Sequence, residues 1–220
     1  MVTSGSRVSD DEAAANEAAA KASAPARVRR CEWALIHPLM QAYHDTEWGV
    51  PLRGDRRLFE FLVLEGMQAG LSWLTVLKKR AAFRRAFDGF DPERVARYRS
   101  AKVRAHMADA GIIRNRLKIE SAIANAQAFL RIRRRHGTFA RFMWGLIGGR
   151  PIQHAYQSTR KLPARTPESD LLSRTLKGEG FRFVGSTICY AHMQATGMVN
   201  DHVVGCFRYR AVRALAAQFR

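Results

Sequence analysis

Large apolar side chains recur at three- and four-residue steps from residue 55 onward, which is the spacing of an α-helix. The first predicted helix has Asp55 as its N-cap, carries Glu65 on its apolar face and is broken at Gly70. The apolar members of that face are Leu58, Phe61 and Leu62. The pattern therefore predicts an amphipathic helix with one carboxylate on its apolar side.

The same periodicity predicts further helices along the chain. Ser72 is the expected cap of a second helix, and Asp91-Pro92 opens a third, because proline suits the first helical turn. The remaining predicted helices cover about residues 100–109, 115–135, 139–147, 168–178 and 187–197. The sequence has no strand-like alternation of useful length, although residues 181–184 are predicted to form a brief extended piece. We therefore predict an all-α fold without internal repeats.

The N-terminal residues 1–29 differ in composition from the rest of the chain. They are rich in alanine, serine and charge and have almost no large apolar side chains, so they cannot bury a core. We predict a disordered tail over residues 1–29, with a transient helix over residues 12–22. A folded domain over residues 30–210 and a short C-terminal extension over residues 211–220 follow it.

Charge and cysteine content narrow the possible functions. The chain has 37 Lys and Arg against 19 Asp and Glu, a formal net charge of +18. The tail contributes none of this excess, so the folded region is expected to attract phosphate backbones, although a basic protein without nucleic-acid function is the alternative. No apolar run is long enough to span a membrane, and three cysteines suit a reducing compartment, so we predict a cytoplasmic protein.

Four cysteine and histidine residues form a split set that suits a metal ion. Cys31 and His44 stand near the start of the folded region, and His202 and Cys206 stand near its end. If the last two lay on a helix, their four-residue spacing would put them on one face. A closed set of two cysteines and two histidines favours structural zinc, whereas ordinary buried side chains are the alternative.

A second set of residues suits a flat ligand. Glu65 precedes a turn with two glycines, and burial of its carboxylate is costly unless it meets a polar ligand. Four aromatic residues stand near it or near the predicted metal ligands: Trp33, Tyr43, Trp48 and Trp73. Aromatic rings stack on bases and attract cations, but they also fill cores, and Glu65 could instead lie on the solvated edge of its helix.

A third stretch, residues 108–118, suits a phosphate backbone. One predicted helix ends at Gly111, and a basic helix begins near Asn115. Backbone N–H groups at such a turn bind anions, and Arg114, Arg116 and Lys118 would strengthen the site. A plain helical hairpin with a solvated face is the alternative.

Taken together, these residues resemble the DNA-3-methyladenine glycosylase I family. The matching stretches run in order from residue 30 to residue 206: Arg30-Cys-Glu-Trp33, residues 43–51, residues 64–80, Asp109-Ala-Gly-Ile-Ile-Arg114, residues 183–190 and residues 200–206. The resemblance implies a helix-hairpin-helix DNA glycosylase fold. It also implies one structural zinc ion, held by Cys31, His44, His202 and Cys206, which joins the two ends of the folded domain.

The resemblance also implies the roles of the pocket residues and the reaction. Glu65 stands where the family's carboxylate bonds the modified adenine, Tyr43 and Trp73 fall at pocket positions, and Trp33 and Trp48 line or support the pocket. The implied activity is base excision repair of alkylated double-stranded DNA. The enzyme would hydrolyse the N-glycosidic bond of 3-methyladenine and leave an abasic site, without lyase activity, as a monomer that does not bind membranes.

The resemblance places DNA contacts in two segments. The turn over residues 68–72 matches the element that enters the duplex, and residues 110–116 match the hairpin that holds the backbone. The expected DNA-binding residues are Gln68, Gly70, Leu71, Gly111, Arg114, Arg116 and Lys118. Two positions depart from the family pattern: Met40 replaces a pocket tyrosine of some members, and Met67 replaces a more usual polar residue.

Other functions were weighed against this one. A zinc-stapled DNA-binding module explains the charge and the metal ligands, but not a carboxylate beside an indole at a glycine-rich turn. A zinc nuclease or deaminase fits less well, because all four metal positions are filled by protein and the deaminase motifs are absent. No aspartate lies between Asp109 and Asp170, and no lysine stands out as a Schiff-base nucleophile, so simple hydrolysis is expected.

Overall fold

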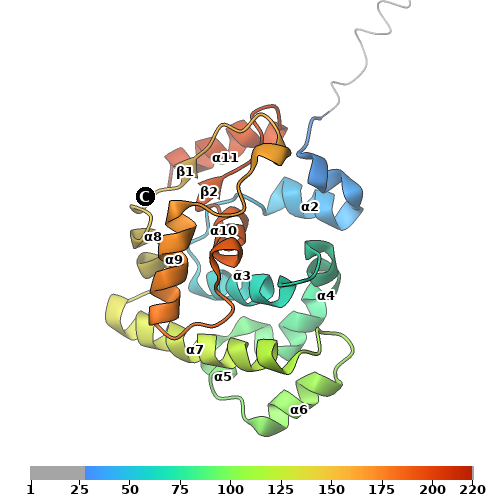
Figure 1. Ribbon diagram of the computed structural model, residues 1–220, viewed down its shortest axis with the longest axis vertical. Helices are drawn as coiled ribbons and strands as arrows, with labels where there is room; N and C mark the ends of the chain where they lie inside the picture. Colours follow the sequence, from blue (N-terminus) through green and yellow to red (C-terminus); the bar gives the residue numbers. More distant parts are fainter. Residues whose placement is uncertain (1–27, 220) are drawn as a thin grey trace, which may run out of the picture.

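The computed structural model describes residues 28–219, and within them the chain is predominantly helical (Figure 1). The α-helices are α2 (Pro38–Thr46), α3 (Asp55–Gln68), α4 (Trp73–Ala86), α5 (Pro92–Val95), α6 (Ser100–Ala108), α7 (Arg116–His136), α8 (Phe139–Gly145), α9 (Pro167–Gly178), α10 (Ser186–Ala195) and α11 (Phe207–Ala217). The 3-10 helices are η1 (Glu32–Ile36), η2 (Asp88–Phe90) and η3 (Thr159–Lys161), and the strands are β1 (Ile152–Gln153) and β2 (Val199–Asn200). The predicted all-α class is thus confirmed, apart from one very short strand pair.

Helix α3 lies at the centre of the molecule. It crosses the middle of Figure 1, with α10 against it and the long α7 running alongside. Ten consecutive residues of α3, from Leu58 to Met67, are buried. A helix buried on every side belongs to the interior of a protein rather than to its surface. The prediction of a single apolar face was therefore too narrow, since both faces of α3 contact other helices.

Local capping explains where several helices begin. The Ser72 side chain accepts the N–H of the third residue of α4, and Asp91 accepts two N–H groups at the start of α5, as predicted. Asp55 does not cap its own helix, because Gly54 occupies the N-cap position of α3. Its carboxylate instead accepts the N–H groups of Phe139 and Ala140, at 3.0 and 2.8 Å, and so joins the start of α8 to α3.

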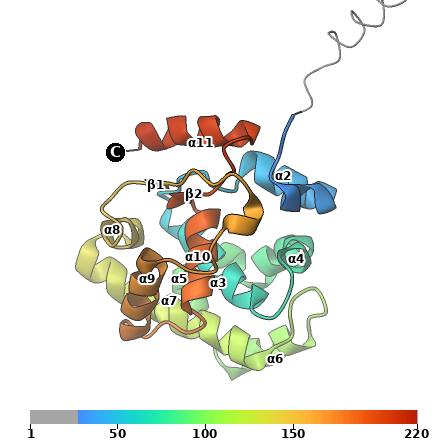
Figure 2. The same ribbon diagram turned by 45° about the horizontal axis from the view of Figure 1, so that its top comes forward.

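The C-terminal part of the chain differs most from the prediction. Strands β1 and β2 form a parallel pair, and α11 passes over them (Figure 2). The sequence pattern indicated neither these strands nor η1, α2 and α11. The expected extended piece over residues 181–184 is a turn, and Phe183 there has a φ of +54°. The expected boundary at residue 210 falls inside α11, while the predicted tail helix over residues 12–22 lies outside the described residues.

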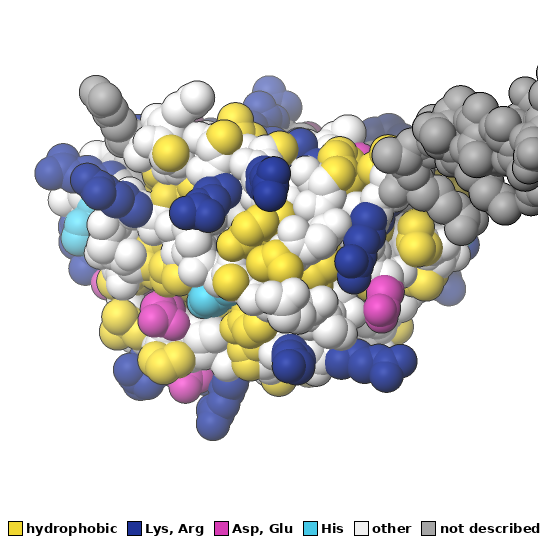
Figure 3. Space-filling view, turned by 90° about the horizontal axis from the view of Figure 1, so that it is seen from above, with side chains coloured by type: hydrophobic (Ala, Val, Ile, Leu, Met, Phe, Trp, Pro, Cys, Tyr) yellow, Lys and Arg dark blue, Asp and Glu magenta, His cyan; other side chains and the backbone are white. Residues whose placement is uncertain are grey.

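Basic side chains are scattered over the face of the molecule that is seen from above. In the view from above, Lys and Arg side chains are distributed across the molecule with few acids between them (Figure 3). None of the helices in the described part of the chain is long and apolar enough to cross a bilayer.

Candidate functional site

The two ends of the described chain meet at a buried cluster of cysteine and histidine side chains. Cys31, His44, His202 and Cys206 are all buried, and their ligand atoms lie within 4.8 Å of one another. The Cys206 Sγ atom is 3.4 Å from His44 Nε2 and 3.7 Å from His202 Nδ1. A tetrahedral zinc ion needs separations of about 3.5 Å between its sulfur and nitrogen ligands. The cluster could therefore hold one metal ion.

Neighbouring groups orient both histidines toward this cluster. The second ring nitrogen of His44 lies 2.7 Å from the Asp45 carboxylate, and that of His202 lies 3.0 Å from the Trp48 carbonyl. Such outer contacts are typical of histidines that ligate metals, because they fix the tautomer and the ring orientation. A hydrogen bond from the Cys31 thiol, followed by those from the two histidines, also lowers the pKa of Cys206.

The helical geometry expected for the second ligand pair was wrong. His202 lies in the connection between β2 and α11, and Cys206 is the N-cap residue of α11. A turn brings the pair together, in which the Cys206 N–H donates to the Val203 carbonyl over 2.8 Å. The spacing of four residues thus suits a turn as well as a helix.

A pocket of about 230 Å³ opens beside this cluster. It lies where η1 and α2 face α3, α4 and α10 (Figure 1). Its lining residues are Trp33, Met40, Tyr43, Trp48, Glu65, Gln68, Trp73, Leu162, Ala191 and Gln194. All four aromatic residues singled out in the sequence therefore share one pocket with Glu65.

The aromatic rings pack closely around the pocket. The ring centroids of Tyr43 and Trp73 are 5.4 Å apart, and those of Trp33 and Trp48 are 4.9 Å apart. The Trp48 ring also packs against that of His202, with 4.6 Å between the ring centroids, so the cysteine and histidine cluster supports one wall of the pocket. The result is an apolar slot with flat walls, suited to a planar ring.

Glu65 is the acidic group of this slot. Its side chain is only 4% exposed, and no hydrogen bond or ion pair reaches it within the described residues. Burial raises the pKa of Glu65 to about 8. The other buried acid of α3, Glu60, differs, because Arg80 and Arg84 both donate to it. The sequence left open a solvated position for Glu65, and the structure excludes that position.

Ion pairs fix the helices that carry the pocket residues. Arg80 of α4 donates to Glu60 of α3 over 2.8 Å and to Glu47, at the end of α2, over 2.9 Å. Arg80 is 7% exposed, so these bonds are screened by little water. The three helices are thereby held in one arrangement around the pocket.

Three pocket residues were not found from the sequence. Leu162 follows η3, whereas Ala191 and Gln194 belong to α10. Gln194 is fixed by a 2.7 Å hydrogen bond to the buried carboxylate of Asp201. Leucine, alanine and glutamine are not residue types that indicate a functional site by themselves, so only the fold could identify these three residues. Met40, noted as a departure from the family pattern, does line the pocket.

The predicted hairpin is present between α6 and α7. Arg114 and Arg116 are exposed there, and Asn115 caps α7 as expected. The N–H of Gly111 already donates to the Asp109 carboxylate over 2.7 Å. That N–H is therefore satisfied within the hairpin, whereas the side chains of the two arginines are exposed and can bind an anion.

The loop over residues 68–72 joins α3 to α4 at the edge of the pocket. Gln68 lines the pocket, Gly70 adopts a positive φ of +76°, and Leu71 is 43% exposed. The exposed Leu71 side chain is therefore available to contact a partner. Lys118, expected at the DNA surface, is instead 7% exposed and donates to carbonyl groups of this region.

Comparison with known proteins agrees with this architecture. A family model described as methyladenine glycosylase matches residues 33–209. The chain is 48% identical over 182 residues to DNA-3-methyladenine glycosylase 1 of Escherichia coli (strain K12), which covers 83% of this chain and 97% of that protein. A DNA-3-methyladenine glycosylase of Haemophilus influenzae (strain ATCC 51907 / DSM 11121 / KW20 / Rd) is 42% identical over 177 residues, covering 80% of this chain and 96% of that protein.

Solved structures give the same result. A crystal structure of 3-methyladenine DNA glycosylase I has a TM-score of 0.79 at 50% identity, covering 81% of this chain and 98% of that one. The enzyme from Staphylococcus aureus has a TM-score of 0.79 at 34% identity, covering 81% of this chain and 95% of that one. The helical fold, the aromatic pocket and these matches define the class of the protein, which is a DNA glycosylase. More narrowly, the chain belongs to the DNA-3-methyladenine glycosylase I family, as the sequence resemblance indicated.

Proposed function

We propose that the protein excises 3-methyladenine from alkylated double-stranded DNA by hydrolysing the N-glycosidic bond, leaving an abasic site. The observation that carries this proposal is the buried carboxylate of Glu65, which has no hydrogen-bond or ion-pair partner among the described residues and shares its slot with four aromatic rings. One solved relative, 33% identical to this chain, is a complex with 3-methyladenine. A flat ring that carries positive charge is the ligand that such a slot stabilises best.

The chemistry of the substrate explains why no strong acid is needed. An adenine methylated at N3 is a cation, so it leaves the sugar as a neutral base. The carboxylate of Glu65 accepts hydrogen bonds from the adenine edge and stabilises the positive charge, while water attacks the sugar carbon. A cation in the slot also favours the ionised form of Glu65, because a nearby opposite charge lowers the pKa of a carboxyl group.

The damaged base must first leave the duplex, which costs a few kcal/mol and less where pairing is impaired. In this proposal Arg114 and Arg116 of the hairpin hold the backbone, and the loop over residues 68–72 enters the space that the base vacates. Leu71, at the tip of that loop, is the exposed apolar group that fills the stack.

We further propose that the cysteine and histidine cluster holds one structural zinc ion. Two thiolates and two imidazoles leave no position open for water, so the ion would stabilise the fold rather than take part in the reaction. It would tie the segment before α2 to the start of α11 and support Trp48 at the pocket wall. The test is metal analysis of the purified protein, with one zinc per chain expected.

Lyase activity is not part of the proposal. That reaction needs an amine to form a Schiff base with the sugar, and no lysine lines the described pocket. Borohydride treatment of a reaction mixture is therefore expected to trap no covalent adduct between protein and DNA.

The decisive experiment is chromatography of the bases released from methylated duplex DNA. The wild-type protein is expected to release 3-methyladenine, and Glu65→Gln to lose about 100-fold or more in rate while still binding a duplex with an abasic-site analogue. Glu93→Gln, on the exposed surface of α5, is the matched control. If the wild-type protein binds methylated DNA but releases no base, the protein is a DNA-binding module and the proposal is wrong.

A further inference from the structure

Lys118 is the lysine whose side chain is most deeply placed within the described chain. It is 7% exposed, although it belongs to the first turn of α7, two residues after the exposed Arg116. Arg80 is equally buried, but its charge is matched by two glutamates. Lys118 forms no ion pair with a described residue, so the structure must stabilise its ammonium group in another way.

Two backbone carbonyl groups stabilise that ammonium group. The Lys118 Nζ atom donates to the Met67 carbonyl over 2.9 Å and to the Ala69 carbonyl over 2.6 Å. These carbonyls belong to the last turn of α3 and to its C-cap, where a helix leaves its acceptors without backbone partners and its dipole is negative. A lysine there caps the helix with a full positive charge.

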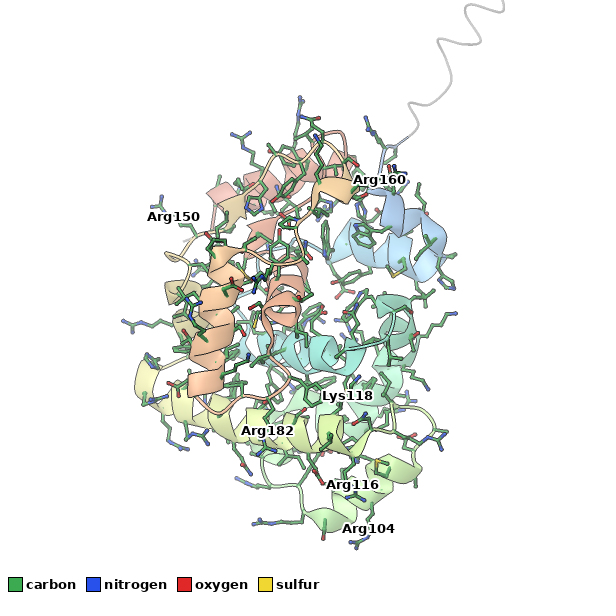
Figure 4. The ribbon with its side chains drawn as sticks, in the orientation of Figure 1. Arg104, Arg116, Lys118, Arg150, Arg160 and Arg182 are labelled. Carbon is green, nitrogen blue, oxygen red and sulfur yellow. The ribbon has the colours of Figure 1, made fainter. Side chains whose placement is uncertain are left out.

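The position of these carbonyls gives the contact a functional meaning. Met67 lies two residues after Glu65, and Ala69 is followed directly by Gly70 and Leu71. Lys118 thus holds the point at which the helix carrying the carboxylate becomes the loop that reaches outward. Figure 4 labels Lys118 beside the end of α3, whereas Arg116 and Arg104 lie farther toward α6.

We propose that Lys118 is a positioning residue that couples the hairpin between α6 and α7 to the loop over residues 68–72. When the hairpin engages the DNA backbone, α7 and the loop are placed as one unit, so the loop enters the duplex with a fixed geometry. This inference rests on the proposed function. It assigns to Lys118 a role inside the protein instead of the contact with phosphate that its sequence position suggests.

The test uses Lys118→Met, which keeps most of the aliphatic side chain and removes the ammonium group. At saturating methylated duplex DNA we expect its rate of 3-methyladenine release to fall by about 10-fold to 100-fold, the scale of a misplaced active-site element. Its affinity for free 3-methyladenine is expected to stay at the wild-type value, because Glu65 and the aromatic rings lie outside the loop. Lys177→Met, on the exposed end of α9, is the matched control.

The salt dependence of DNA binding separates the two roles of a lysine. The logarithm of the affinity falls linearly with the logarithm of the salt concentration, and each lost phosphate contact reduces the magnitude of this slope by about 0.9. With a duplex that carries an abasic-site analogue, Lys118→Met is expected to keep the wild-type slope, whereas Arg116→Gln is expected to lower it. A lowered slope for Lys118→Met together with a wild-type rate at saturation would overturn the inference.

Amide hydrogen exchange gives a direct readout of the loop. Exchange over residues 69–72 is expected to be faster in Lys118→Met than in the wild-type protein, and to be restored in part by Lys118→Arg, which keeps the charge and can reach a carbonyl. Unchanged exchange in Lys118→Met would contradict the coupling. A wild-type protein that releases no 3-methyladenine defeats the proposed function instead, and the exchange result remains a separate test of the contact.

Discussion

Glu65→Gln is expected to make the folded protein more stable at alkaline pH while it removes the activity. The carboxylate of Glu65 is buried in an aromatic slot, and burial raises its pKa from 4.5 to about 8. Glutamine has nearly the same shape and cannot ionise. The substitution therefore removes the cost of charging a buried group without leaving a cavity.

The sign and size of the effect follow from proton linkage. Between pH 4.5 and about pH 8 the folded protein keeps a proton on Glu65 that the unfolded chain has lost. Stability therefore falls as the pH rises through this range. A tenfold change in a protonation equilibrium is worth about 1.4 kcal/mol, so the whole fall is at most about 5 kcal/mol.

The assay is urea unfolding of both proteins at about pH 5, 7 and 9, saturated with zinc. The free energy of unfolding of Glu65→Gln minus that of the wild-type protein is expected to increase with pH, because contributions of other groups cancel in the difference. For the exposed control Glu93→Gln the difference is expected to stay constant. A constant difference for Glu65→Gln would refute the claim that burial raises the pKa of this carboxyl group in the free protein.

Two further predictions concern the cysteine and histidine cluster and a buried histidine of α10. A strong chelator, or Cys206→Ser, is expected to lower the melting temperature, since a ligand at about 1,000 times its Kd contributes about 4 kcal/mol, and an unchanged value would exclude structural metal. His192 is fully buried, neither ring nitrogen has a partner among the described residues, and burial lowers its pKa to about 3. Its contribution to stability is therefore lost as the pH falls below 6.5. In the same unfolding assay, the free energy of unfolding of His192→Phe is expected to gain about 2 kcal/mol relative to that of the wild-type protein between about pH 7.5 and pH 5. Parallel curves of this free energy against pH for the two proteins would contradict the prediction.

The helices that bury one apolar face against the core were predictable from the sequence. Helices α4 and α7 begin at the predicted caps, Ser72 and Asn115, because a side chain that accepts the N–H of a first turn acts locally. Asp55 shows the limit of this reasoning. Although Asp is also a common capping residue, Asp55 is the first residue of α3, and its carboxylate accepts N–H groups of a distant helix, α8; only the packing of α8 against α3 decides that.

The elements that the sequence did not reveal depend on contacts between distant segments. Strands β1 and β2 have two residues each, too few for an alternating pattern, and their register is set by neighbours far apart in the chain. The pocket residues Leu162 and Gln194 could not be identified from the sequence either, since a leucine and a glutamine at these positions have no distinctive chemistry. The four cysteine and histidine residues could be found from the sequence because both residue types have distinctive metal-binding chemistry.

Helix α3 shows why the environment of Glu65 could not be derived from periodicity. A period of 3.6 residues predicts one buried and one solvated face, so an acid near the edge can be assigned to water. In the fold α3 is central, and both of its acids at 60 and 65 are buried. One of them, Glu60, forms ion pairs with three arginines, and the other forms none with a described residue.

This contrast between the two acids links stability to function. A protein that needed only a stable core would have paired both carboxyl groups or replaced them, because a buried acid without a partner among the described residues ionises only at a cost of several kcal/mol. The chain retains Glu65 and compensates elsewhere on the same helix, with Arg80 binding Glu60 and Lys118 capping the last turn. The helix is thus held firmly at the residues around a destabilising one. That arrangement is expected where a buried carboxyl group awaits a cationic ligand.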